Sequence, residues 1–452
     1  MSSRLIDSLA TTDPLAEIFS DDSVLQAMLE VEAALACAAA RAGAIPEAAA
    51  RTISGVARPE FFDAARIARD ARGSATPAIP LVEALEQRVR AVGAGSAEYV
   101  HWGATSQDVT DTAMILLLKR ALPVVAADHE RLAAALRRLS DAHAVTLMLG
   151  RTLLQPAVPI TFGLKTAGWF AAVARSWRRL AAAWEGALAL QLGGAAGTRA
   201  AFGAQADVIA RELAQELGLA LVPPWHTDRD RLGALVTACG LYAAALGKMA
   251  RDVALLMQHE VAEVAEPGGG SSAMPHKRNP SACALALATA ARMPGLIAAF
   301  LSGMVQEHER SLGGSQAEWP TLASSVQATG SAAAAMAGAM EGLSVDADRM
   351  RSNLDATNGV VFAEQAITLL GPHVGREVAR GLASEAVRRS RESGGRFADI
   401  LRAMPDISAA ERADVLAELD APERAIGEAE SLRRELLECS QVAEQPPSRE
   451  EA

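Results

Sequence analysis

The sequence is poor in aromatic residues and in cysteine. Of its 452 residues, 4% are aromatic and four are cysteines, whereas 50% are hydrophobic. Sheets favour β-branched and aromatic side chains, so a core rich in alanine and leucine favours closely packed helices. The cysteines form no CxxC or Cys/His spacing, which argues against a zinc site. We therefore predict an all-α protein with reduced thiols and no metal.

A net positive charge is missing as well. The chain has 54 acidic and 43 basic residues, a formal net charge of -11, so its surface repels nucleic acid and anionic membranes. The first residues, MSSRLIDSLATTDP, contain no apolar signal region. The longest uncharged run, Trp319 to Met340, has few large apolar residues, which favours a bundle helix over a membrane span. We expect a cytoplasmic protein that binds neither nucleic acid nor membrane.

Common cofactor signatures are also absent. No GxGxxG follows a predicted strand, and the motifs GxxxxGK(S/T), HExxH and GxSxG do not occur. Nucleotide, zinc and serine-hydrolase chemistry therefore lose their usual support in the sequence. We expect no cofactor.

Long windows of helical periodicity occupy the middle of the chain. Between Asp230 and Glu266, apolar residues alternate at spacings of four and three, the pattern of a bundle seam; they are Leu235, Cys239, Tyr242, Leu246, Met249, Val253 and Leu256. Similar windows run from Asp111 to Val145, Phe162 to Leu192, Ser281 to Val305 and Glu318 to Leu343, with kinks expected at Pro123 and Pro294. We predict an N-terminal helical domain at 1–110, a central long-helix bundle at 111–345, a C-terminal helical domain at 346–438 and a flexible tail at 439–452.

A polar loop, GGGSSAMPHKRNP from Gly268 to Pro280, interrupts these apolar windows. Its glycines permit mobility and its prolines fix the second half, which suits a lid. The basic side chains His276, Lys277 and Arg278 can bind carboxylates. Ser271 can transfer a proton only where cations and N–H donors stabilise its alkoxide. A solvated Gly/Ser linker explains the composition equally well.

Three further polar segments flank the predicted helices. HWGATSQDVTDT, from His101 to Thr112, precedes one helix, and Asp108 or Thr110 is expected to be its N-cap. GRTLLQPAVPITFG, from Gly150 to Gly163, has the composition of a helix–helix connection. QEHERSLGGSQAEW, from Gln306 to Trp319, is by default a solvated charged turn. Four polar segments at the ends of long helices are what an active site at the end of a bundle requires.

These segments resemble the conserved regions of the fumarase/aspartase superfamily. The signature GSSxMPxKxNP is matched at every fixed position from Gly270 to Pro280. GATSQD, from Gly103 to Asp108, resembles the first conserved region, and Arg151 to Gly163 resembles the second. The resemblance implies three all-α domains and a homotetramer whose central helices form a 20-helix core, with active sites that combine regions of different subunits.

The same resemblance implies roles for individual residues. Ser271 would be the proton-transfer residue, and Lys277 a second catalytic residue that binds a substrate carboxylate together with Asn279. Further substrate contacts are implied for His101, Thr105, Ser106, Thr152, Gln155, Ser272, Met274, His276 and Arg310.

Within the family, the motifs resemble most the cycloisomerases of 3-carboxy-cis,cis-muconate. Many lyases of the family carry a histidine after the threonine of the second region as the acid for the leaving group, and this chain has Leu153 there. The stretch from Arg69 to Pro80 lacks the histidine of adenylosuccinate lyases. An amine leaving group needs a proton, whereas a carboxylate, with a pKa of about 4, does not. We expect lactonisation of this tricarboxylate to carboxymuconolactone, a step of the β-ketoadipate pathway.

Two other functions stay open from the sequence. One is a C–N lyase of the adenylosuccinate or argininosuccinate type that releases fumarate, with His101 as a substitute acid. The other is a catalytically silent helical scaffold, against which the intact signature loop argues. The related cycloisomerases carry tryptophan at the position of Leu153, so a sulfonate in place of one carboxylate of the substrate also stays open.

Overall fold

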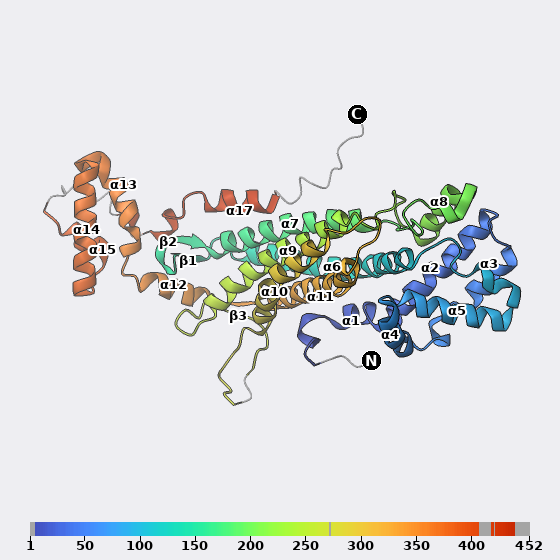
Figure 1. The fold of residues 1–452 in the computed structure, drawn as a ribbon. Coiled ribbons are helices and arrows are strands. Elements are labelled where there is room, and N and C mark those ends of the chain that lie inside the picture. Colours follow the sequence, from blue (N-terminus) through green and yellow to red (C-terminus); the bar gives the residue numbers. More distant parts are fainter. Residues whose placement is uncertain (1–4, 271–272, 406–416, 420, 439–452) are drawn as a thin grey trace. The chain divides into compact units, whose positions relative to one another are not determined.

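The computed structural model describes residues 5–270, 273–405, 417–419 and 421–438, and these residues are mostly helical (Figure 1). The chain forms two compact units. Unit 1 comprises Met1–Glu130, Ser176–Gly247 and Ala284–Met336, and unit 2 comprises Arg131–Arg175, Lys248–Cys283 and Ala337–Ala452. The predicted helical class is confirmed, and the division into three domains stays a prediction.

Short and medium helices open the chain and close it. Unit 1 contains α1 (Asp13–Ile18), α2 (Asp21–Arg41), α3 (Glu47–Val56), α4 (Ala64–Ser74), α5 (Ala78–Val92) and α8 (Ala206–Leu217). Unit 2 contains α12 (Ala347–Asp355), α13 (Ala363–Val374), α14 (Arg376–Ser393), α15 (Phe397–Arg402) and α17 (Ala429–Glu438). Each of the five long helices has residues in both units. They are α6 (Ser106–Ala142), α7 (Phe162–Ala187), α9 (Asp230–Leu256), α10 (Ser281–Gly303) and α11 (Gly314–Glu341).

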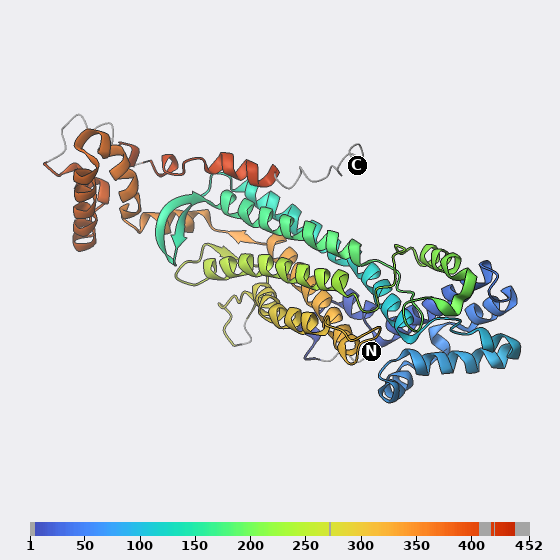
Figure 2. The same ribbon diagram turned by 45° about the horizontal axis from the view of Figure 1, so that its top comes forward.

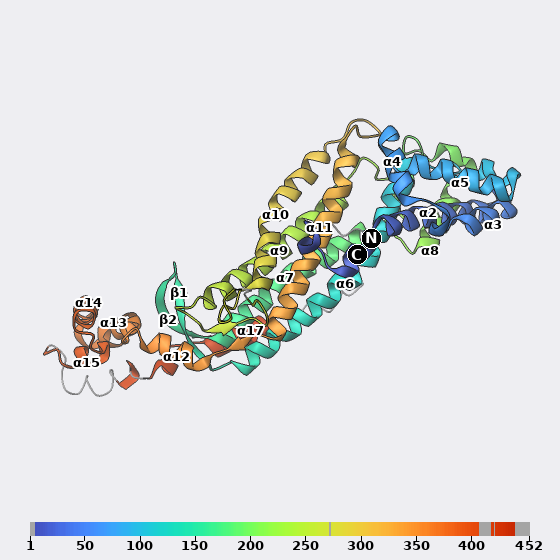
Figure 3. The same ribbon diagram turned by 90° about the horizontal axis from the view of Figure 1, so that it is seen from below.

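The five long helices confirm the predicted windows, with shifted ends. All seven residues of the predicted seam on α9 are buried. Within unit 1, the Trp184 indole of α7 donates to the Leu118 carbonyl of α6 at 3.0 Å. The Thr289 hydroxyl of α10 donates to the Ala328 carbonyl of α11 at 3.3 Å, and these two helices lie side by side (Figure 3). The window from Asp230 ends at Leu256 rather than at Glu266, because the chain leaves the helix before β3.

Two glycines of α9, seven residues apart, allow α9 and α10 to pack closely in unit 1. A Cβ atom at Gly240 would lie 2.3 Å from Ile297, and one at Gly247 would lie 2.7 Å from the Cβ of Ala290. The Ile297 side chain could rotate away from the first contact, but the Cβ of Ala290 moves only with its backbone, so position 247 requires glycine at this helix spacing. The predicted apolar stripe therefore has a glycine stripe beside it that the sequence analysis missed.

Three helices are long and apolar enough to cross a membrane by length and composition alone, namely α2, α9 and α10. The most apolar windows of α2 and α9 are 61% and 67% buried, but that of α10 is 22% buried. The α10 outer face is defined here as the exposed residues Ala284, Ala288, Ala291, Ala298 and Leu301, which are three, four or seven residues apart and therefore share one side of the helix. An apolar face of this kind normally lies against another surface.

The second conserved region connects α6 to α7, as expected, but the connection is a β-hairpin, whose strands the sequence analysis did not predict. Strand β1 (Leu147–Thr152) pairs antiparallel with β2 (Gln155–Thr161), with an irregularity between Leu149 and Arg151 (Figure 2). A Cβ atom at Gly150 would lie 2.4 Å from the Val158 carbonyl. The buried side of β1 joins Phe362, Leu370 and Phe397 in the core of unit 2. A second small sheet pairs β3 (Val264–Ala265) with β4 (Ser344–Val345).

Candidate active site

Helix α6 begins inside the first conserved region. Thr105 precedes the helix, and its N–H donates to Asp108 Oδ2 at 3.1 Å, which is one half of a capping box. The predicted N-cap, Asp108 or Thr110, was therefore wrong, because Asp108 is the third helical residue. Its buried carboxylate also accepts from Gln191 and from the N–H groups of Gly193 and Gly194. Burial raises the pKa of Asp108, and these hydrogen bonds oppose the rise.

The side chains at the start of α6 leave donors open. In the part of the chain that the structure describes, the hydroxyls of Thr105 and Ser106 have no hydrogen-bond partner. The first N–H groups of an α-helix also lack intrahelical acceptors, and the helix dipole favours an anion there. The start of α6 thus presents several donors at one point, which suits a carboxylate.

Gln107 and Arg310 form a hydrogen-bonded clamp beside these donors. Gln107 Nε2 donates to Asp111 Oδ2 at 3.1 Å and to the His226 carbonyl at 2.8 Å, while its Oε1 accepts from Arg310 Nη1 at 2.8 Å. Arg310 Nη2 donates to the carbonyls of Gly194 and Ala195 at 3.2 and 2.9 Å. Arg310 is therefore held by the protein, and part of its donor capacity is already used.

A buried ion triad adjoins the clamp through Asp111, which accepts from both Gln107 and Arg229. The Arg229 guanidinium donates to both oxygens of Asp111 at 2.7 and 3.0 Å and to Glu318 at 2.7 Å, and all three side chains are at most 2% exposed. Burial lowers the pKa of Arg229, but the two carboxylates raise it more, so the pKa lies above its ordinary value. Sequence reasoning missed the triad.

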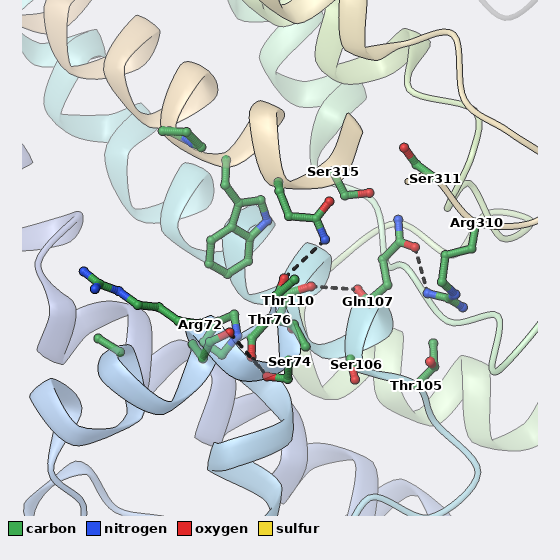
Figure 4. Close-up of a pocket in the computed structure, with 17 residues that line it drawn as sticks. Arg72, Ser74, Thr76, Thr105, Ser106, Gln107, Thr110, Arg310, Ser311 and Ser315 are labelled. Carbon is green, nitrogen blue, oxygen red and sulfur yellow. Dashed lines mark hydrogen bonds between the residues drawn. The ribbon is translucent and has the colours of Figure 1, made fainter. Parts of the chain in front are cut away.

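A cavity of about 540 Å³ opens in unit 1 at the start of α6 (Figure 4). Thr105, Ser106, Gln107 and Arg310 line it; the resemblance implies substrate contacts for the first two and for Arg310, and these roles stay predictions. Among the described residues that line it, none is acidic, which suits an anionic ligand. The lining residues that sequence reasoning missed come from the α4–α5 connection and from α11, and include Arg72, Ser74, Thr76, Ser315, Gln316 and Trp319.

Two hydrogen bonds hold the part of the cavity wall that is formed by the α4–α5 connection and α11. Gln316 Nε2 donates to the Ala75 carbonyl at 3.2 Å, and Ala75 has a left-handed backbone with φ of 54°. The Thr76 hydroxyl accepts the N–H of Ala78 at 3.3 Å, at the start of α5. The signal for these residues was the polar break RGSATP between two helices, which the sequence analysis noted only for its lack of histidine.

The second conserved region lies in unit 2 and exposes its polar residues. Thr152 and Gln155 pair across the end of the hairpin, and Leu153 and Leu154 form its two-residue turn with φ of 50° and 63°. Leu153 is 97% exposed. Next to the turn, Arg151 donates to both oxygens of Glu263 at 2.6 and 3.0 Å, which anchors the turn end of the hairpin.

The signature loop lies in unit 2 as well. Ser271 and Ser272 lie outside the described residues, so their predicted roles stay predictions. Met274, His276 and Lys277 are exposed and Asn279 is partly exposed. The Asn279 N–H donates to the Gly269 carbonyl at 2.6 Å, and a Cβ at Gly269 would lie 1.8 Å from the Asn279 carbonyl oxygen, so this position requires glycine.

The loop leads directly into a capped helix. The buried Glu266 carboxylate accepts the N–H groups of Ala282 at 2.8 Å and Cys283 at 3.3 Å, at the start of α10. In the part of the chain covered by the structure, no group of three or more His, Cys, Asp or Glu side chains could hold a metal ion.

Comparisons with known proteins agree with the motifs. Residues 8–295 match the family model described as Lyase. The chain is 43% identical over 451 residues to 3-carboxy-cis,cis-muconate cycloisomerase of Pseudomonas aeruginosa, which covers 98% of both chains. The chain belongs to the fumarase/aspartase family of lyases.

Other members of this lyase family are similar too. Nitrosuccinate lyase of Streptomyces davaonensis is 42% identical over 445 residues, which covers 96% of this chain and 94% of that protein. The crystal structure of 3-carboxy-cis,cis-muconate lactonizing enzyme from Pseudomonas putida has a TM-score of 0.92 and 40% identity, and covers 97% of this chain and 99% of that one. The motif-based assignment to the family is confirmed.

The predicted site of this lyase is divided between the two units. Thr105, Ser106 and Arg310 belong to unit 1. The predicted residues of the hairpin and the signature loop belong to unit 2, namely Thr152, Gln155, Met274, His276, Lys277 and Asn279. His101 belongs to unit 1 but does not line the cavity; its ring lies against Glu32.

Proposed function

We propose that this lyase lactonises 3-carboxy-cis,cis-muconate to carboxymuconolactone. One substrate carboxylate forms a C–O bond to a carbon of the C=C bond, and a proton that comes from solvent is delivered to the adjacent carbon, so the trianion becomes a dianionic lactone. Ser271 transfers that proton. Negative charge develops on a second carboxylate, where Lys277 and Asn279 stabilise it. A metal is not required, because these donors supply the electrophile.

The observation that carries the proposal is the residue at the tip of the β1–β2 hairpin. Thr152 is followed by Leu153, whose side chain has no proton to give. A carboxylate forms or leaves as a stable anion without a proton donor, whereas an amine does not. Leu153 is therefore compatible with lactonisation and unfavourable for elimination of an amine.

The unit 1 cavity supports a carboxylate-rich substrate. Its lining lacks acidic side chains and includes the open hydroxyls of Thr105 and Ser106 beside the helix start. Enzymes of this family act on small carboxylates, and the 43% identical relative is a cycloisomerase of a tricarboxylate. Local donors and cations must attract this trianion, because the chain as a whole carries a net charge of -11.

We further propose that the enzyme is a cytoplasmic homotetramer with active sites shared between copies. Two apolar surfaces of the single chain support the assembly, the α10 outer face and the hairpin tip with Leu153 and Leu154 at 97% and 73% exposure. Packing of α10 faces from four copies would build the 20-helix core.

A second candidate reaction is elimination of nitrite from nitrosuccinate. The 42% identity to nitrosuccinate lyase favours it. Nitrite, like a carboxylate, leaves as a weakly basic anion, so Leu153 is compatible with this reaction as well. The C–N lyase reaction on adenylosuccinate or argininosuccinate is less well supported, because its amine leaving group needs an acid.

The direct test incubates the purified enzyme with 3-carboxy-cis,cis-muconate, with and without a chelator. The expected result is loss of the ultraviolet absorbance of the conjugated diene at the same rate in both samples, with carboxymuconolactone identified by NMR. Persistence of the diene at high enzyme concentration would overturn the proposal.

A further inference from the structure

A polar pair in unit 1 lies outside the cavity. Glu32 on α2 is 1% exposed, and its Oε1 lies 2.6 Å from His101 Nδ1. Its other oxygen, Oε2, is buried and has no hydrogen-bond partner among the residues described. A buried carboxylate with one idle oxygen is costly, so the Glu32–His101 contact needs an explanation beyond packing.

The backbone at His101 also points to a special role. Its φ of 57° lies in the left-handed region, which is uncommon for a residue other than glycine. Such a conformation persists only where the surroundings over-determine it, and it clusters at functional sites. Here it accompanies the placement of the ring against Glu32, while the side chain keeps 20% of its surface exposed.

The charged groups that raise the pKa of the His101 imidazole are acidic. They come from three helices, Glu32 of α2, Glu86 of α5 and Asp108 of α6. Burial lowers the pKa of His101, but these carboxylates raise it more, so the net direction is upward. The ring therefore keeps its proton to a higher pH than an ordinary histidine.

We propose that Glu32 is a positioning residue that holds His101 as a cation, with Nδ1–H donated to Glu32 and Nε2–H presented as a donor to a substrate carboxylate. Within the described part of the chain Nε2 has no partner, which leaves it open for this contact. The pairing with Glu32 stands on the geometry alone, and the substrate contact rests on the proposed function. Glu32 acts through His101 and does not itself touch substrate.

The first test measures the titration of His101 in the full-length enzyme labelled with ¹³C at histidine Cε1. The His101 signal is assigned by its loss in His101→Asn. Glu32→Gln keeps an oxygen that accepts from Nδ1–H but removes the charge, so His101 should titrate at least about one pH unit lower than in the unaltered enzyme. Glu86→Gln, a matched control without a hydrogen bond to the ring, should give a smaller shift.

An unchanged titration in Glu32→Gln would overturn the pairing. If that variant does not fold, the titration of His101 in the unaltered enzyme is the test. The pairing requires His101 to titrate above the ordinary histidine pKa of about 6.5. A lower value there would also overturn the pairing.

The second test separates binding from chemistry. A raised pKa keeps the imidazolium to a higher pH than in an ordinary histidine, and the charge is lost as the pH rises through the folded value. KM for carboxymuconate should therefore rise at high pH. In Glu32→Gln this rise should begin about one pH unit lower than in the unaltered enzyme. Between these two pH values, KM of the variant should be about tenfold above that of the unaltered enzyme, while kcat stays within about twofold. A loss confined to kcat would overturn the binding role.

The lactonisation reaction and the role of the Glu32–His101 pair can fail separately. If the enzyme does not convert carboxymuconate, the proposed function fails, and the unreactive tricarballylate replaces the substrate in a calorimetric titration across the same pH range. Weaker tricarballylate binding by Glu32→Gln in that window supports the role of the pair, and equal binding contradicts it.

Discussion

The two parts of the predicted site differ in how the chain holds them. In unit 1, Gln107 and Arg310 are fixed by hydrogen bonds, and the buried triad around Arg229 lies beneath them. In unit 2, Thr152 and Lys277 are exposed, and their side chains have no hydrogen-bond partner in the described residues. Unit 1 thus has a preformed cavity, whereas Thr152 at the hairpin end and Lys277 in the signature loop carry exposed side chains that no described residue binds by a hydrogen bond.

This difference is informative about function. A group that is buried and paired contributes to stability, and its loss leaves uncompensated charges. An exposed, unpaired group can change without a cost in stability, so its sequence specificity points to substrate or to another copy of the chain. We therefore expect variants of the two parts to separate cleanly into folding defects and catalytic defects.

The largest effect is expected from Arg229→Met. Removing the guanidinium leaves Asp111 and Glu318 buried without a counter-ion, which should lower the free energy of unfolding by about 3–5 kcal/mol. Denaturant titration measures this change. As a control, Arg388→Met removes two solvent-accessible ion pairs, with Glu385 and Glu392, and should leave the unfolding midpoint nearly unchanged. Equal midpoints for both variants would contradict a supporting role for the triad.

The next largest effect is expected from Ser271→Ala. Proton transfer by a positioned side chain contributes about 10² or more to the rate, so kcat should fall by at least about 10²-fold while KM changes little. Steady-state kinetics with carboxymuconate measure both. Ser302→Ala, which alters a hydroxyl on α10 that donates to a backbone carbonyl, is the matched control. Near-normal turnover by Ser271→Ala would assign proton transfer to another residue.

Lys277→Met should show a smaller effect of a different kind. The cation meets a carboxylate in the ground state and more strongly as charge develops, so KM should rise about tenfold or more and kcat should fall. Because Lys277 is exposed in the loop, the unfolding midpoint should stay where it is. Full activity with an unchanged KM would remove Lys277 from the site.

The smallest effect is expected from Leu153→His. An added imidazole has no basic leaving group to protonate during lactonisation, so kcat/KM for carboxymuconate should not increase. The kinetic comparison with the unaltered enzyme is direct, since the residue is at an exposed turn. A clear gain in lactonisation would show that the reaction is limited by a missing acid.

The sequence predicted the parts of the molecule that depend on local patterns. The spacing of four and three from Leu235 to Leu256 identifies a helix, because each apolar residue reports on its own turn. The signature loop is likewise contiguous, so its motif could be identified without a structure.

The sequence did not predict the parts that depend on distant partners or unusual turns. Arg229 meets Asp111 and Glu318 across 118 and 89 residues, a separation that local patterns do not report. The hairpin was not predicted, because its turn residues, Leu153 and Leu154, adopt positive φ without the Asn-Gly pair that normally indicates such a turn. The resemblance identified the same segment as the second conserved region but gave no information on its secondary structure.

The central claim is that this lyase joins or releases a group that needs no proton. The most direct measurement compares kcat/KM for carboxymuconate, nitrosuccinate and adenylosuccinate on one preparation, with lactone, nitrite and fumarate as the respective products detected. The account predicts the highest value for carboxymuconate and no fumarate from adenylosuccinate. Robust fumarate release from adenylosuccinate would contradict it, and would require a leaving-group acid other than residue 153, with His101 the first to test.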